Sequence, residues 1–207
     1  MRNLMYMLID LLSGAVVALP LAWLFLRLCG NRGGKRFLLY SLFILYLCKM
    51  FDVVGIPALQ YIRWDPNISL IPLSDEKNLR FFLQLGLNAA MFAPFGFLLP
   101  VLWRKCRKWK VTVLAGFLLS LTIEVLQMFC FRATDVDDLL MNTLGAGLGY
   151  SLARIFFHKK WTRDTGPGTF KVSDSLSLTV SILIPLLTIV LVRTPISDCI
   201  YRLPLFD

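Results

Sequence analysis

The chain alternates between long apolar runs and short polar or charged segments. Six runs approach or exceed the 20 or so residues that a helix needs to cross the hydrocarbon core of a membrane. These runs are Leu4–Cys29, Phe37–Pro57, Phe81–Trp103, Val111–Phe129, Val136–Phe157 and Leu176–Val192. The pattern predicts an all-α protein, a polytopic transmembrane bundle of about six helices. The first run is too long for the apolar region of a signal peptide, and we expect it to be a membrane anchor.

Composition agrees with residence in a membrane. Hydrophobic residues make up 57% of the 207 residues and charged residues only 17%, against roughly 45–50% and about 25% in soluble domains. The net charge of +9 comes from basic residues beside the apolar runs. That distribution favours lipid headgroups as partners and argues against nucleic acid. The segment Arg104–Lys110, which contains Trp109, is therefore expected to lie at anionic lipid.

The basic residues also predict an orientation. The first, third and fifth loops hold three, five and four Lys and Arg residues, and the opposite side holds seven in all. Because Lys and Arg near helix ends are enriched on the cytoplasmic side, the odd-numbered loops are expected in the cytoplasm and both termini outside. We divide the chain into an N-terminal helix with its loop (1–36), a core (37–158), and a cytoplasmic linker with the last helix (159–207).

Several polar residues fall inside the apolar runs, where a charged side chain costs about 2.5–3.5 kcal/mol on insertion scales. Lys49 and Asp52 are three residues apart on one helix and can form an ion pair. A set of polar residues lies about six residues, or roughly 9 Å, from the outer ends of their runs. This set comprises Asp10, Asp52, Asn88, Glu124 and Asn142. Helices that run in opposite directions thus place polar groups in one layer.

Helical spacing puts many of these groups on shared faces. One stripe consists of Asp135, Asp138, Asn142, Gly145 and Gly149, and a second of Ser120, Glu124 and Gln127. Residues three or four apart are neighbours on a helix surface, and glycines at this spacing let a second backbone approach closely. We expect the third, fourth and fifth helices to pack with these stripes inward, around a polar pocket open to the outside.

Arg132 lies in the short connection between the fourth and fifth helices. Its guanidinium suits bidentate binding of a phosphate from a lipid or substrate. A salt bridge to Asp135 or Asp138 is the alternative, and the more ordinary one. Asn88, Gln127, Arg132, Asp135 and Asn142 are accordingly the candidate ligand-binding residues.

Two stretches of this sequence resemble the signatures of the VanZ-like family. The first contains Leu70-Ile71-Pro72-Leu73, and then Asn88 followed by Ala93-Pro94-Phe95-Gly96-Phe97-Leu98-Leu99-Pro100. The second contains Ser120, Glu124 and Gln127, followed by Asp135, Asp138, Asn142-Thr143, Gly145-Ala146 and Gly149-Tyr150. The resemblance covers roughly residues 37–157. It implies a multi-pass protein of the bacterial plasma membrane, and a link to resistance to teicoplanin, a lipid-tailed glycopeptide antibiotic.

The sequence leaves several functions open. The first is recognition or modification of a lipid-linked or lipid-tailed envelope component, with a lipid or glycopeptide as the ligand. The second is an intramembrane enzyme in which Glu124 and Asp138 act as general acid and base, or in which Glu124, Asp135 and Asp138 hold a divalent cation. The third is an ion-coupled transporter. The sole histidine, His158, lies at the predicted cytoplasmic end, so no outward Ser–His or Cys–His nucleophile is expected.

Overall fold

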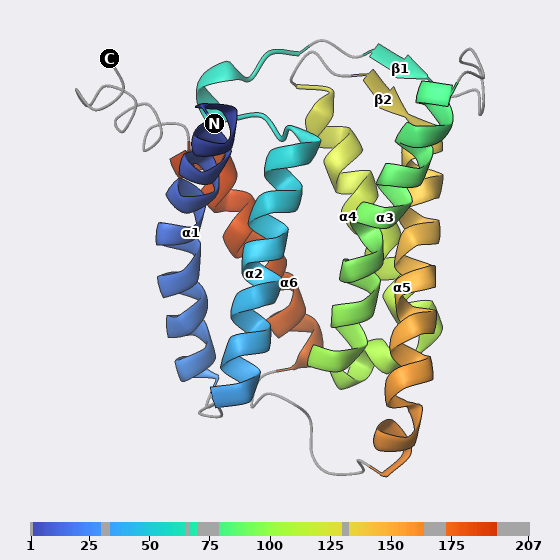
Figure 1. Cartoon of the computed structure of the whole chain (residues 1–207). Coiled ribbons are helices and arrows are strands. Elements are labelled where there is room, and N and C mark those ends of the chain that lie inside the picture. The colour runs from blue at the N-terminus through green and yellow to red at the C-terminus, as the bar shows by residue number, and fades with distance from the viewer. Residues whose placement is uncertain are drawn as a thin grey trace. The chain divides into compact units, whose positions relative to one another are not determined.

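A computed structural model describes residues 2–29, 34–64, 67–69, 79–129, 133–163 and 173–193. Within these residues six α-helices follow one another along the chain (Figure 1). They are α1 (Arg2–Leu28), α2 (Gly34–Val54), α3 (Leu79–Leu102), α4 (Trp109–Gln127), α5 (Val136–Arg163) and α6 (Asp174–Thr188), which continues as a π-helical turn, Ile189–Arg193. Two 3-10 turns, Leu59–Tyr61 and Arg104–Arg107, complete the helical structure. The predicted all-α helical bundle is confirmed.

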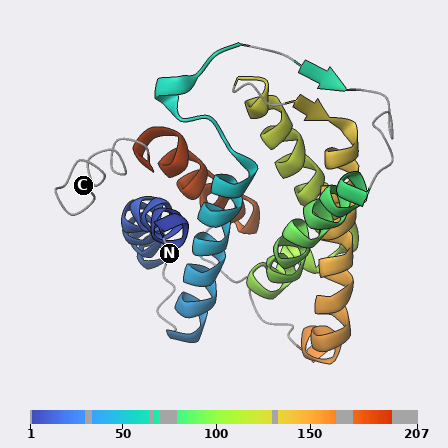
Figure 2. The same cartoon turned by 45° about the horizontal axis from the view of Figure 1, so that its top comes forward.

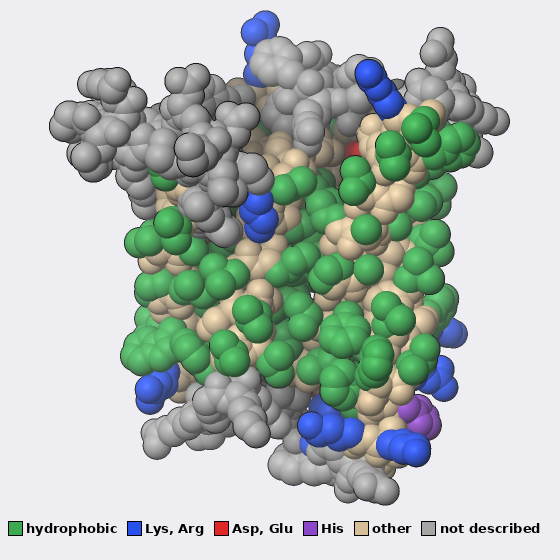
Figure 3. All heavy atoms as spheres, viewed as in Figure 1, with side chains coloured by type: hydrophobic (Ala, Val, Ile, Leu, Met, Phe, Trp, Pro, Cys, Tyr) green, Lys and Arg blue, Asp and Glu red, His purple; other side chains and the backbone are tan. Residues whose placement is uncertain are grey.

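Four segments of the described chain are long and apolar enough to cross a membrane. These are Phe37–Val54, Leu79–Leu102, Trp109–Gln127 and Asp174–Val192, and α1 contributes a shorter apolar stretch, Leu12–Leu28. The helix α5, with 28 residues, is the longest of the described helices, but Asn142, Arg154 and three central glycines lower its hydropathy. In the space-filling view, hydrophobic side chains cover the flanks of the helices, and Lys and Arg side chains lie near their ends (Figure 3).

The chain forms two compact units, one of Met1–Ile62 with Phe170–Asp207 and the other of Arg63–Thr169. In the first unit α1, α2 and α6 pack against one another. The hydroxyls of Tyr40 and Ser181 lie 2.6 Å apart between α2 and α6. The predicted ion pair within α2 is confirmed, with Lys49 Nζ 2.7 Å from Asp52 Oδ2. The division at residues 37 and 158 rests on sequence motifs alone and stays a prediction.

The second unit contains α3, α4 and α5, together with a short parallel sheet. Strands β1 (Asn67–Ser69) and β2 (Ala133–Asp135) pair with Ile68 opposite Thr134. Each strand leads toward a long helix, since α3 comes after β1 and α5 directly follows β2 (Figure 1). The sheet was not expected from the sequence, because three-residue strands are too short to show a hydrophobic period. It places β1 beside the strand that leads directly into α5.

Small residues determine how closely α3 and α5 pack against each other. Figure 2 shows the two helices from a second direction. A Cβ atom added at Gly145 would overlap the backbone carbonyl of Ala89, and one at Gly149 would overlap that of Ala93. Both pairs advance by four residues in the same sense, so the two helices run parallel. The close backbone approach predicted for these two glycines is therefore confirmed.

Candidate functional site

Glu124 anchors the start of α5 to the end of α4. It is the fourth residue from the end of α4 and only 3% exposed. Its Oε2 accepts the backbone N–H of Asp135 at 3.1 Å, and its carbonyl oxygen accepts the Thr134 hydroxyl at 3.0 Å. Asp135 in turn caps α5, since its Oδ1 accepts the backbone N–H of Asp137 at 2.9 Å. A buried carboxylate thus fixes the strand β2 and the first turn of the helix.

Asn88 and Asp138 join α3 to α5. The Asn88 side-chain amide donates a hydrogen bond to Asp138 Oδ1, with 2.5 Å between nitrogen and oxygen. Both residues are half-buried. Asn88 directly precedes Ala89, which packs on Gly145. The polar contact therefore lies at the end of the closely packed stretch of the two helices.

Asn142 and Ser120 join α5 to α4, one helical turn along α5 from Asp138. The Asn142 amide donates to Ser120 Oγ at 2.9 Å, and both side chains are buried. Among the described residues, the carbonyl oxygen Oδ1 of Asn142 has no hydrogen-bond partner, although the residue is only 3% exposed. An unsatisfied buried polar atom of this kind costs about 1–3 kcal/mol. It marks a position where a further donor would be favourable.

The structure thus brings most of the predicted site residues together in pairs. Asn88 meets Asp138, Glu124 meets Asp135, and Asn142 meets Ser120. Gln127 is buried at the end of α4, with 7% exposure. Arg132 and the side chain of Asp10 lie outside the described residues, so their predicted roles stay predictions. Asp52 belongs to the other compact unit, and the pocket itself stays a prediction.

The alternative metal site receives no geometric support. In the part of the chain that the structure describes, no group of three or more His, Cys, Asp or Glu side chains is placed to hold a metal ion. Glu124, Asp135 and Asp138 therefore do not form such a group. Glu124 and Asp135 accept backbone N–H groups, and Asp138 accepts the Asn88 amide.

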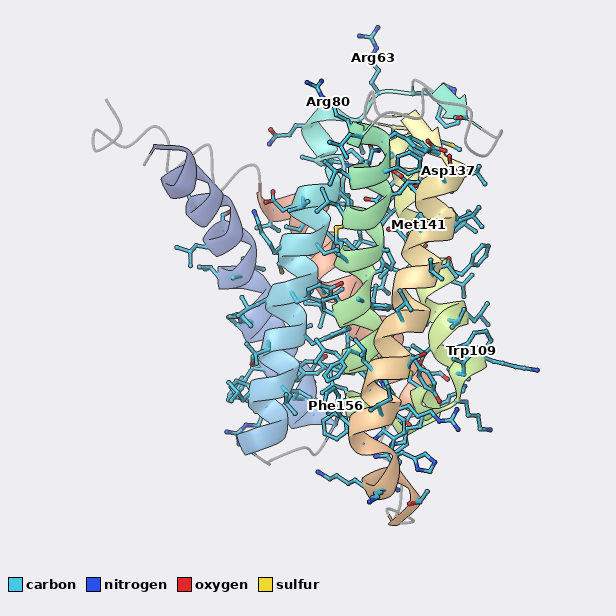
Figure 4. The ribbon with its side chains drawn as sticks, turned by 45° about the vertical axis from the view of Figure 1, so that its right-hand side comes forward. Arg63, Arg80, Trp109, Asp137, Met141 and Phe156 are labelled. Carbon is cyan, nitrogen blue, oxygen red and sulfur yellow. The ribbon has the colours of Figure 1, made fainter. Side chains whose placement is uncertain are left out.

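Cations lie at the same end of this unit as the acidic residues. Figure 4 shows Arg63 and Arg80 at the end where Asp137 lies, with Met141 one turn further along α5. Both arginines are exposed. The backbone N–H of Arg63 donates to Phe129 O at 3.0 Å, and Trp64 packs on the Phe129 ring with centroids 5.0 Å apart. The pattern of basic residues places both arginines on the outer side, but helical spacing does not connect them with the polar layer, and nothing in the pattern distinguishes Thr134.

These features define a multi-pass membrane protein with buried polar contacts at one end of a three-helix unit. A family model for VanZ/LLP1 matches residues 37–157. The chain belongs to the VanZ/LLP1 family. It is a multi-pass bacterial membrane protein.

One relative is Protein VanZ of Enterococcus faecium. This chain is 34% identical to it over 95 residues, which cover 42% of this chain and 52% of that relative. The chain therefore spans about half the length of the curated relative it matches. No solved structure matches this chain.

Proposed function

We propose that this protein recognises a lipid-linked or lipid-tailed component of the cell envelope from the outer face of the membrane. The observation that carries the proposal is the buried Asn142 carbonyl oxygen, which has no hydrogen-bond partner among the described residues. It lies one turn along α5 from Asp138 and beside Ser120. A hydroxyl or amide donor from a bound headgroup would offset the cost of burying that oxygen.

The arrangement of charge favours a headgroup that carries both hydrogen-bond donors and a phosphate. Asn142 supplies an acceptor oxygen. The carboxylates of Glu124, Asp135 and Asp138, which accept donors of the protein, lie near the start of α5. Arg63 and Arg80 are exposed at the same end. Arginine side chains bind phosphate or carboxylate groups in a planar, bidentate manner. A lipid-linked sugar phosphate or an acylated glycopeptide offers this combination of chemical groups.

The contacts favour recognition over acid–base catalysis. The Asp138 carboxylate accepts the Asn88 amide, and the Glu124 carboxylate accepts a backbone N–H. Both therefore hold other parts of the protein in position. His158 lies 20 residues beyond Asp138 on α5, about 30 Å away along a helix. It is too distant to act as a base for a nucleophile near Asp138.

The similarity to Protein VanZ and the family resemblance suggest which ligand to try first. Teicoplanin carries a lipid tail and vancomycin does not, so the pair separates recognition of a lipid-tailed ligand from a general glycopeptide effect. A sensitive Gram-positive host would express wild type, Asp138→Asn, Asn142→Leu or the control Asp174→Asn, at matched levels in the membrane. Asp174 lies in the other compact unit, at the start of α6.

We expect wild type and Asp174→Asn to raise the teicoplanin concentration that inhibits growth several-fold, without changing the vancomycin value. Asp138→Asn and Asn142→Leu should lose this protection. Equal protection by all four proteins would overturn the assignment of the site, and no protection by wild type would overturn the teicoplanin ligand. Analysis of envelope lipids from the same strains checks the enzymatic alternative, because a new lipid product lost in Glu124→Gln would indicate catalysis.

A further inference from the structure

The other end of the α3–α5 unit is strongly basic. Residues 103–123 and 139–163 contain no Asp or Glu. The basic end is defined here by Arg104, Lys105, Arg107, Lys108, Lys110, Arg154, Lys159 and Lys160. In this unit, the acidic residues that the structure describes are Glu124, Asp135, Asp137 and Asp138, at the opposite ends of α4 and α5. The unit is therefore polarised along its helices.

The dimensions of α5 put this basic end at a membrane surface. From Asp137 to Lys159 the helix advances by 22 residues, or about 33 Å at 1.5 Å per residue. The hydrocarbon core of a bilayer is about 30 Å thick. When Asp137 lies at one layer of headgroups, Lys159 and Lys160 thus reach the other.

The basic turn between α3 and α4 is held firmly. Trp103 and Cys106 are buried, with 0% and 1% exposure. The Thr112 hydroxyl donates to the Cys106 carbonyl at 2.5 Å, and the Tyr150 hydroxyl on α5 donates to the Arg107 carbonyl at 2.7 Å. These contacts tie the turn to both α4 and α5. The cations of the turn are therefore presented from an ordered backbone.

Arg107 is oriented by aromatic residues near the end of α5. Its guanidinium carbon lies 5.7 Å from the centroid of the Trp161 ring, within the range of a cation–π contact. Trp161 also packs near Tyr150, with ring centroids 6.3 Å apart. A stacked guanidinium keeps its planar set of donors and suits a phosphate better than a flexible lysine does. Lys105 and Lys108, on either side of Arg107 in sequence, are exposed.

Apolar side chains flank the cations on the same elements. Trp109 is 52% exposed and Phe156 is 72% exposed, and both lie toward the end of the unit opposite Asp137 (Figure 4). Exposed aromatic residues beside cations are typical of the boundary between acyl chains and headgroups. Such a combination suits a ligand that is both anionic and apolar, and it disfavours free phosphate or nucleic acid.

We propose that the turn Arg104–Arg107, together with Trp161, binds the headgroup phosphate of an anionic phospholipid in the cytoplasmic leaflet. The phosphate contacts Arg107 and the neighbouring lysines, and the acyl chains lie along the exposed apolar side chains. This site is separate from the acidic end of α5, and it stands independently of the function proposed for that end. Its ligand is an ordered lipid molecule in addition to the diffuse attraction of the anionic membrane surface.

The test uses the full chain in vesicles of phosphatidylcholine at 0.15 M salt. Quenching of tryptophan fluorescence by brominated phosphatidylglycerol, relative to brominated phosphatidylcholine, gives the relative binding constant of the anionic lipid. Lys105→Gln/Lys108→Gln removes two exposed cations from the basic end. Arg27→Gln is the control, which removes an exposed cation that lies over the Trp23 ring in the other compact unit. Arg107→Lys keeps the charge but loses the planar guanidinium.

We expect wild type to prefer the anionic lipid and Arg27→Gln to retain that preference. The lysine pair of substitutions, Lys105→Gln/Lys108→Gln, should lower the relative binding constant of the anionic lipid by about fivefold per cation, or roughly 25-fold. Arg107→Lys should lower it several-fold. No preference in wild type, or an equal loss in the lysine pair and in Arg27→Gln, would overturn the site. Wild-type behaviour of Arg107→Lys would reduce the binding to diffuse attraction and overturn the ordered site. Equally tight binding of inorganic phosphate, measured by calorimetry in neutral vesicles, would overturn the lipid as ligand.

Discussion

Asn142 on α5 donates a hydrogen bond to Ser120 on α4 at 2.9 Å, while its own carbonyl oxygen has no partner among the described residues. The pair joins two helices inside a mainly apolar unit. The amide nitrogen stabilises the packing of the two helices through this hydrogen bond. The buried carbonyl oxygen destabilises the fold unless a ligand or solvent molecule supplies a donor. This division separates the contribution of Asn142 to stability from its contribution to binding.

Replacing the amide by an apolar side chain of similar shape should therefore separate these two contributions. We expect the free energy of unfolding of the double variant Asn142→Leu/Ser120→Ala to lie within about 1 kcal/mol of the wild-type value, because both polar partners are removed together. Ser120→Ala alone should cost about 1–3 kcal/mol, since it leaves the amide nitrogen buried without an acceptor. Thermal unfolding in detergent measures both. A double variant that is less stable than Ser120→Ala would contradict this account.

The glycines of α5 differ sharply in how they tolerate a side chain. A methyl group at Gly149 would overlap the Ala93 backbone, whereas at Gly147 the nearest neighbour is Val113 Cγ2 at 3.7 Å. Gly149→Ala should destabilise the protein by about 1–3 kcal/mol, because α3 and α5 must move apart. Gly147→Ala is the matched control and should be neutral or stabilising by up to about 1 kcal/mol. Equal unfolding temperatures for the two variants would argue against the close approach of these helices.

The Lys49–Asp52 pair should matter more as a pair than as two separate charges. The side chains are 31% and 14% exposed, so each single variant removes the ion pair from a poorly solvated charge. We expect Lys49→Leu or Asp52→Leu to lower the free energy of unfolding by about 1–3 kcal/mol, and the double variant to lower it by less than either. A double-mutant cycle of unfolding in detergent measures the coupling. Additive costs would show that the ion pair contributes nothing.

The predicted orientation is directly measurable at the two ends of the α3–α5 unit. Arg63 and Lys108 are both exposed and lie on opposite sides of the predicted membrane. In a background without the five native cysteines, Arg63→Cys should react in intact cells with a maleimide that cannot cross the membrane. Lys108→Cys should react only after the cells are opened. The reverse pattern would invert the orientation and move both proposed sites to the other leaflet.

The sequence by itself determined the elements and the family. Apolar runs predicted the six helices to within a few residues for the most part, because burial in lipid requires a long uninterrupted apolar helix. The spacing of Gly145 and Gly149 predicted a close helix contact, because only a residue without a side chain permits it. The separated polar positions between Asn88 and Gly149 carried the resemblance to the VanZ-like family, which the match over residues 37–157 confirms.

The tertiary structure decided which polar groups are partners. Helical periodicity gives the face on which Asn88, Glu124 or Asn142 lies, but not the atom it meets on another helix. The pattern of hydrophobic and polar positions also did not predict the parallel β1–β2 pair or the grouping of α2 with α1 and α6. Three-residue strands carry no period, and a uniformly apolar helix can pack against any other. Hydrogen bonds between helices depend on distances of a few ångströms across the bundle, and the three-dimensional arrangement alone fixes these distances.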